Sequence, residues 1–198
     1  ALLVVISSTT LTSATTRPSG YNYAKMLSAN VGTCVTTISD GVFANCSNLT
    51  SVTIPNSITS IGYSAFEKCS GLTSINIPDG VTSIGSSAFV DCSGLTSINI
   101  PSGITTIRQS AYARCSSLSA VTIPSGVTSI EQNAFSYCTG LTSITCLATT
   151  PPTLGGYYYY IFNNTNDCPI YVPAESVNTY KSASGWSYYA SRIQAIPT

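Results

Sequence analysis

Hydrophobic and polar positions recur along this chain with a fixed step. Cysteine, leucine and aromatic residues each return every 23 residues, without insertion, between positions 43 and 141. The unit reads C-S-x-L-T-S-[VI]-x-I-P-x-[GS]-[VI]-T-S-I-x-x-x-A-[FY]-x-x, and its best-kept positions are Cys46, Cys69, Cys92, Cys115 and Cys138, then Leu49, Leu72, Leu95, Leu118 and Leu141, then Phe43, Phe66, Phe89, Tyr112 and Phe135. Self-similarity at a fixed period indicates a repeat architecture.

Each unit predicts two short strands and a turn. Residues 72–77 alternate apolar and polar side chains, which is the period of a half-buried strand. Pro78 ends this strand because proline cannot donate to a ladder. Residues 81–84 predict a second short strand, and residues 86–89 suit a tight turn or a single helical turn that points Ala88 and Phe89 inward.

One such coil cannot bury its own apolar residues, but stacked coils can cover one another at a spacing of about 4.8 Å. The pattern therefore predicts a right-handed, strand-rich solenoid with two parallel sheets. We expect an N-terminal cap over residues 1–33, repeats over 34–147 (four full and two partial units), and a C-terminal cap with helices over 148–198.

The apolar segment at residues 1–6 has two interpretations. It could be the remnant of a signal-peptide core, or it could be a β-strand of the N-terminal cap, which we favour. Apolar runs in the chain fall short of the roughly 20 residues that cross a membrane, so no membrane span is expected.

The C-terminal tail predicts a cover for the last coil. Ile170 and Val172 repeat the inward alternation of a strand, and residues 174–183 suggest a short helix. Trp186, Ala190 and Ile193 continue an apolar stripe that suggests a second helical stretch. Terminal repeats need such covers for solubility.

Composition narrows the function. Only 7% of residues are charged, the net charge is zero and histidine is absent. Nucleic acid is disfavoured because phosphate binding needs clustered Lys and Arg. The usual general base is missing and no two acidic residues are spaced to share a pocket, so neither a hydrolytic triad nor a glycosidase site is supported. We expect no enzyme, no catalytic residues, no cofactor and no metal.

The repeat resembles the BspA-like, Treponema pallidum-type leucine-rich repeats of bacterial surface proteins, which are common in Bacteroides. The resemblance covers residues 34–197, including the tail that begins Cys168-Pro169-Ile170-Tyr171-Val172-Pro173. It implies a leucine-rich-repeat solenoid, secretion or display at the cell surface, and adhesion to host or bacterial proteins. It implies no catalytic residues.

The cysteines divide into two groups. Leucine-rich repeats usually place a buried Asn or Cys at the repeat position that is occupied here by Cys46, Cys69, Cys92, Cys115 and Cys138, so this Cys column is expected to hold reduced, buried thiols. A straight row of equivalent positions does not form the tetrahedron that zinc requires. Cys146 and Cys168 both fall near the C-terminal cap, where a disulfide between them is an open alternative.

Stacking also predicts lateral ion pairs. Lys68, Asp91 and Arg114 alternate in sign at one repeat position, and Arg108 stands one coil before Glu131. Equivalent side chains on neighbouring coils lie about 5 Å apart, within reach of an ion pair.

Two surfaces are candidate binding sites. The first strand of each unit presents an uncharged outward row, Thr53, Asn76, Asn99, Thr122 and Thr145. Tyr157, Tyr158, Tyr159 and Tyr160 form the second candidate, as anchors for a partner that also contacts the row. Alternatively, the tyrosines form a cap strand over the core, and the polar row serves solubility alone.

The sequence thus favours an extracellular or cell-surface binding module whose partner is a host or bacterial surface or matrix protein or a glycoconjugate. The alternative is a structural subunit of a surface filament or layer, which self-assembles through the N-terminal strand and the ends of the solenoid.

Overall fold

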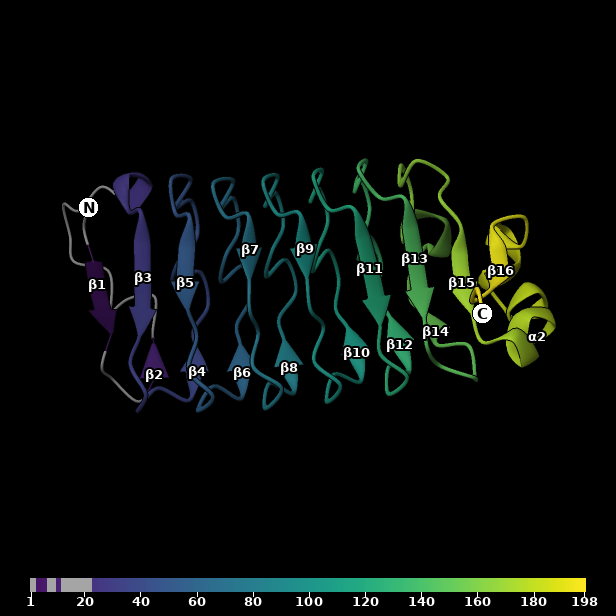
Figure 1. The fold of residues 1–198 in the computed structure, drawn as a ribbon, viewed down its shortest axis with the longest axis horizontal. Coiled ribbons are helices and arrows are strands. Elements are labelled where there is room, and N and C mark those ends of the chain that lie inside the picture. The colour runs from purple at the N-terminus through teal and green to yellow at the C-terminus, as the bar shows by residue number, and fades with distance from the viewer. Residues whose placement is uncertain (1–2, 7–9, 12–22) are drawn as a thin grey trace.

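The chain is a parallel β-solenoid in the computed structural model, which describes residues 3–6, 10–11 and 23–198. Successive coils lie side by side along the long axis, with β1 and β16 at opposite ends (Figure 1). The leucine-rich-repeat solenoid predicted from the period of 23 residues is confirmed.

The first strand of each coil contributes to one parallel sheet surface, which we call the first-strand face. Hydrogen-bonded neighbours within it run in the orders β1-β3-β5, β7-β9 and β11-β13-β15-β16. The strands are β1 (Leu3–Ile6), β3 (Ser28–Val31), β5 (Ser51–Thr53), β7 (Ser74–Ile75), β9 (Ser97–Ile98), β11 (Ala120–Ile123), β13 (Ser143–Cys146), β15 (Ile170–Val172) and β16 (Ile193–Ala195).

The second strand of each coil contributes to the second-strand face. Its hydrogen-bonded orders are β2-β4-β6-β8 and β10-β12-β14, all parallel. The strands are β2 (Thr10–Leu11), β4 (Thr37–Ile38), β6 (Ser60–Ile61), β8 (Ser83–Ile84), β10 (Thr106–Ile107), β12 (Ser129–Ile130) and β14 (Thr153–Leu154). Ser60 pairs with Ser83, so the register equals the sequence period.

The core lies between these faces and consists of columns of equivalent residues. Its aromatic column is a continuous stack in which neighbouring ring centroids are 5.1 to 5.9 Å apart. The stacked rings are Phe43, Phe66, Phe89, Tyr112, Phe135 and Phe162. Offset stacking of this kind adds about 0.5–1.5 kcal/mol per pair beyond the apolar area that is buried.

A third side of each coil, the turn face, joins the second strand to the next cysteine. In the five coils whose turns lie between residues 41 and 137, two positions per coil have left-handed backbone, and nine of these ten residues are not glycine. Ser64 and Lys68, with φ of 49° and 58°, are the pair in one coil. The conformation aims backbone N–H groups at the following coil, as in Lys68 N–H to the Val90 carbonyl at 2.8 Å.

Threonine hydroxyls that lie just before the strands donate hydrogen bonds to backbone carbonyls of the preceding coil. The Thr96 hydroxyl donates to the Thr73 carbonyl at 3.0 Å, and Thr142 donates to Ser119 at 2.9 Å. Thr128 does the same on the second-strand face, with a 3.2 Å bond to Thr105. The recurring Thr residues therefore have a structural role beyond their preference for strands.

The N-terminal region contains regular solenoid strands. Residues 3–6 form the predicted strand, β1, which pairs in parallel with β3 of the next coil. Sequence inspection missed β3, and it also missed Met26, which is buried where later coils have leucine. A short 3-10 helix, η1 (Tyr23–Lys25), precedes β3. The boundary of an N-terminal cap at residue 33 stays a prediction.

The C-terminal tail folds over the end of the core. After β15 come η3 (Ala174–Ser176), α2 (Val177–Ser182) and η4 (Trp186–Tyr189). The Trp186 indole N–H donates to the Pro152 carbonyl at 2.7 Å, and its ring packs against Phe162, the last ring of the stack. The prediction that a second helical stretch reaches Ile193 is wrong, because the helical residues end at Tyr189 and Ile193 lies in β16.

Candidate functional site

The row predicted on the first-strand face points outward. Its residues lie on or directly after the first strands, where Thr53, Asn76, Asn99 and Thr122 are exposed and Thr145 is half-buried. The row carries no charge. Its side chains alternate with buried core residues such as Val121 and Ile144.

Asn99 differs from the other members of the row because its amide is already engaged. The Asn99 Nδ2 group donates to the Ile77 carbonyl at 2.7 Å, and the Ile77 N–H donates to Asn99 Oδ1 at 3.0 Å. The side chain thus completes the backbone pairing of the preceding coil just beyond β7. The sequence predicted that Asn99 contacts a binding partner, whereas in the structure its side chain also joins two neighbouring coils.

A shallow groove of about 520 Å³ surrounds Asn99 and Thr122 on the first-strand face. It also involves Leu147, an exposed apolar side chain, and half-buried Ile98. Asp79 is the one charged residue of its lining. The groove thus combines apolar contacts with a polar surround that carries one charge, a composition suited to a macromolecular partner.

The tyrosine run does not form the predicted cap strand. It contains a 3-10 helix, η2 (Tyr158–Tyr160), and the Tyr157 and Tyr160 side chains are 61% and 39% exposed. The side chain of Tyr159 lies outside the described part of the structure. Ile161 and Phe162, which directly follow the run, cover the core instead.

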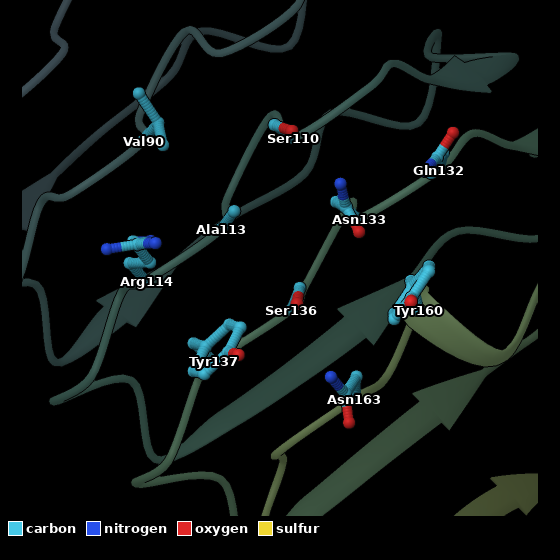
Figure 2. A pocket seen from close by; sticks show the side chains of 10 residues that line it. All are labelled: Val90, Ser110, Ala113, Arg114, Gln132, Asn133, Ser136, Tyr137, Tyr160 and Asn163. Carbon is cyan, nitrogen blue, oxygen red and sulfur yellow. The ribbon is translucent and has the colours of Figure 1, made fainter. Parts of the chain in front are cut away.

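The tyrosines also lie apart from the polar row. They follow β14 of the second-strand face, and Tyr160 lines a groove on the turn face (Figure 2). The groove on the first-strand face has a different lining, built around Asn99, Thr122 and Leu147. The structure therefore does not bring the two predicted sets together.

The turn-face groove encloses about 360 Å³. Tyr137 and Tyr160 lie on either side of Asn133, Ser136 and Asn163 (Figure 2). The Arg114 guanidinium lies over the Tyr137 ring, 5.5 Å from its centroid. The sequence pattern did not predict this groove, because its side chains come from four coils and their residue types change at a given repeat position, as from Arg114 to Tyr137.

The Cys column is buried within the core. All eight cysteines, which lie within residues 23–198, are reduced. Four column thiols donate to backbone carbonyls of the preceding coil, with sulfur–oxygen distances of 3.0 to 3.3 Å; the donors are Cys69, Cys92, Cys115 and Cys138. Burial raises the pKa of Cys92 to about 12, so its thiolate is strongly disfavoured at neutral pH.

Cys146 and Cys168 do not form the disulfide that the sequence left open. Cys146 lies 3.1 Å from the Tyr180 hydroxyl, which itself donates to the Ala148 carbonyl. Cys168 contacts Arg192, whose Nε donates to its carbonyl at 2.8 Å. The two thiols therefore belong to separate contacts of the C-terminal cap.

The predicted lateral ion pairs are wrong. Within the described residues, Lys68 pairs with its sequence neighbour Glu67 at 3.5 Å, and Arg192 pairs with Asp167 at 3.9 Å. Glu131 accepts a hydrogen bond from the Gln109 N–H instead of pairing with Arg108. A spacing of 23 residues brings backbones together but does not direct long side chains toward one another.

Residues 3–6, 10–11 and 23–198 contain no cluster of three or more His, Cys, Asp or Glu side chains that could hold a metal ion. Among the helices that the structure describes, none is long and apolar enough to cross a membrane.

The stacked coils, their two parallel sheets and their leucine column define a leucine-rich-repeat protein, a class that generally serves as non-enzymatic binding modules. More narrowly, six copies of the BspA type leucine-rich repeat match residues 36–168, and the chain belongs to that family. It is thus a BspA-type leucine-rich-repeat protein, and the family implies a protein-interaction module.

Solved structures show the same fold. The Treponema pallidum leucine-rich-repeat protein is 25% identical, with a TM-score of 0.63 over 74% of this chain and 68% of that one. A leucine-rich-repeat protein from Bacteroides ovatus is 21% identical, with a TM-score of 0.59 over 75% of this chain and 50% of its own. This chain therefore spans about half of the Bacteroides protein's length. No curated protein matches the chain.

Proposed function

We propose that this protein is a secreted or cell-surface adhesive module that binds a surface or matrix protein or a glycoconjugate through the first-strand face. The groove around Thr122 and Leu147 carries the proposal, since an exposed apolar side chain borders the uncharged polar row there. Partly exposed apolar anchors within a polar surround are typical of protein interfaces.

The architecture supports binding to an extended partner surface. The row is held on strands whose neighbours are hydrogen-bonded, as in the pairing of Thr122 with Thr145, so its side chains are preorganised. A rigid surface loses little conformational entropy when a partner binds. Repeat proteins use extended sheets of this kind for recognition.

The C-terminal end favours a binding module over end-to-end assembly through that end. Trp186 and Tyr189 are buried against Phe162 and cover the aromatic column. A covered end offers less apolar surface to a second copy than an open core would.

Binding of the purified protein to immobilised matrix proteins and to whole bacteria tests the proposal. Thr122→Arg combined with Leu147→Arg introduces two charges into the groove, and we expect at least a tenfold loss of affinity, because unpaired charges are costly at an interface. The matched control is Thr105→Arg on the second-strand face, which should bind like the wild type. Equal binding by the double variant and the control contradicts the proposed face.

Surface display is tested separately. In cells that express the protein, antibody labelling without permeabilisation should detect it at the surface or in the medium. Detection only after the cells are lysed contradicts an adhesive role.

A further inference from the structure

The turn-face groove is formed by four successive coils. Val90 comes from the first, Arg114 from the second, Tyr137 from the third and Tyr160 from the fourth. The groove lies on a different side of the coil from the first-strand face and shares no lining residue with the groove there, so the two sites can be tested by separate substitutions.

In these coils, residue types at surface positions differ from those of the other coils, whereas the residues of the core keep the repeat pattern. At the repeat position of Tyr137, the other coils have Asn45, Lys68, Asp91 and Arg114. From Phe135 to Phe162 the step is 27 residues instead of 23. Ile130 pairs with Leu154, so three of the four extra residues fall between Leu154 and Phe162, in the segment that carries Tyr160. The aromatic stack nevertheless continues, with 5.9 Å between the two ring centroids. Core packing therefore does not require the changes, and exposed segments free of packing constraints often carry function.

The backbone conformation at Tyr137 is unfavourable for a tyrosine. Its φ is 60°, a left-handed conformation in which glycine and asparagine cost less than a bulky side chain. Its ring is nevertheless 47% exposed. The cation–π contact with Arg114 favours this position of the ring, which forms one wall of the groove.

The lining has a distinct chemical character. Two tyrosine rings stand beside three carboxamides, those of Gln132, Asn133 and Asn163, and none of the ten lining residues is acidic. Each carboxamide offers two donors and an acceptor, which match hydroxyl groups that both donate and accept. Aromatic rings pack against the apolar C–H face of a sugar ring. A volume of about 360 Å³ suits a small ligand.

We propose that the turn-face groove binds a neutral oligosaccharide. Tyr137 and Tyr160 pack against the sugar rings, and the carboxamides of Asn133 and Asn163 between them bind the hydroxyl groups. The groove's one cation, Arg114, lies over the Tyr137 ring, whereas the other polar groups of the lining are neutral amides and hydroxyls, which match an uncharged ligand.

An array of neutral and acidic glycans tests this site, with the full chain as the probe. The wild type should bind neutral glycans. Tyr137→Asn removes the ring and keeps a residue that the equivalent left-handed positions, Asn45 and Asn164, already contain. Asn163→Asp removes the amide donors at nearly constant shape. Each change should weaken binding by about tenfold or more.

Two controls separate this site from other surfaces. Tyr63→Ala removes an exposed ring at the repeat position of Gln132, three coils away, and should leave glycan binding unchanged. The first-strand variant Thr122→Arg with Leu147→Arg should also keep it, so failure of the adhesive proposal does not affect this result. The inference is overturned if the protein binds only acidic glycans or no glycans, or if folded Tyr137→Asn and Asn163→Asp bind like the wild type.

Discussion

The side chain of Asn99 hydrogen-bonds both the N–H and the carbonyl of Ile77, which lies 22 residues earlier in the chain. These bonds occupy a place in the stack where β7 and β9 are only two residues long. Asn99 therefore replaces part of the strand pairing between two coils, although the sequence shows it only as one of five polar residues in a row.

Asn99→Ala should lower the free energy of unfolding by about 1–2 kcal/mol, because it leaves two backbone groups without their amide partner. Urea denaturation measures the change. Asn76→Ala, at the equivalent position one coil earlier, is the control and should stay within about 0.5 kcal/mol of the wild type. Equal effects of the two substitutions would show that the Asn99 amide does not support the stack.

Ser64→Gly should stabilise the protein by about 1 kcal/mol. Ser64 has a φ of 49°, and its buried hydroxyl has no hydrogen-bond partner in the structure. Glycine removes both the backbone strain and the unpaired hydroxyl, which outweighs its greater freedom in the unfolded chain. Ser64→Ala, which removes only the hydroxyl, should give a smaller gain. A lower melting temperature for Ser64→Gly would contradict the claim that the left-handed backbone at Ser64 is strained.

Stability should fall as the pH rises from about 9 toward 12. Burial raises the Cys92 pKa from 9.0 to about 12, and it raises the pKa of Cys146, Cys168 and Tyr112 in the same direction. Above pH 9 the unfolded chain loses these protons while the folded chain keeps them, so ionisation favours unfolding. The contribution of Cys92 is fully present below its unfolded pKa and is lost by about pH 12.

Thermal melts across this pH range measure the effect. Cys92→Ala should give a shallower decline of the melting temperature with pH than the wild type, because it removes one thiol whose pKa is raised by folding. Ser93→Ala, at the exposed neighbour, should leave the slope unchanged. A melting temperature that is flat from pH 8 to 11 would mean that the column thiols are accessible to water.

Removal of the C-terminal cap should expose the aromatic column. A chain that ends at Pro151 lacks Phe162 and Trp186 and should aggregate, as measured by light scattering. In the full chain, Trp186→Ala should cost about 3–5 kcal/mol by leaving a cavity beside Phe162. Ser187→Ala, at the exposed neighbour, serves as its control. A soluble, cooperatively folded product from the truncated chain would rule out the capping role.

The repeat period predicted much of the fold because equivalent core residues recur at the same spacing along the chain. Stacking in register requires that equivalent residues be buried together, so the Leu, Phe and Cys columns could be identified from spacing alone. Prediction failed where the pattern weakens. Met26 replaces the column leucine, and the strand Ser28–Val31 has Ala and Asn at its centre, so the coil before the recognised repeats was missed.

The surface was predicted less well, for a physical reason. Alternation shows which side chains of a strand point outward, but it does not show which of them bond to the next coil, as Asn99 does. Side-chain direction at left-handed turn positions is also absent from the pattern. The Lys68, Asp91 and Arg114 ion pairs were therefore wrong, and the groove between Tyr137 and Tyr160 was missed.

The proposed recognition by the first-strand face is tested most directly by amide hydrogen exchange on the Tyr137→Asn variant, whose turn-face groove is altered, in complex with whichever matrix protein or glycoconjugate binds it. Added protection should concentrate in β9, β11 and β13, around Thr122 and Leu147, because a partner bound there shields these strands from water. Protection confined to the second-strand face, in β10 and β12, or to the turn face would contradict the first-strand face as the adhesive surface.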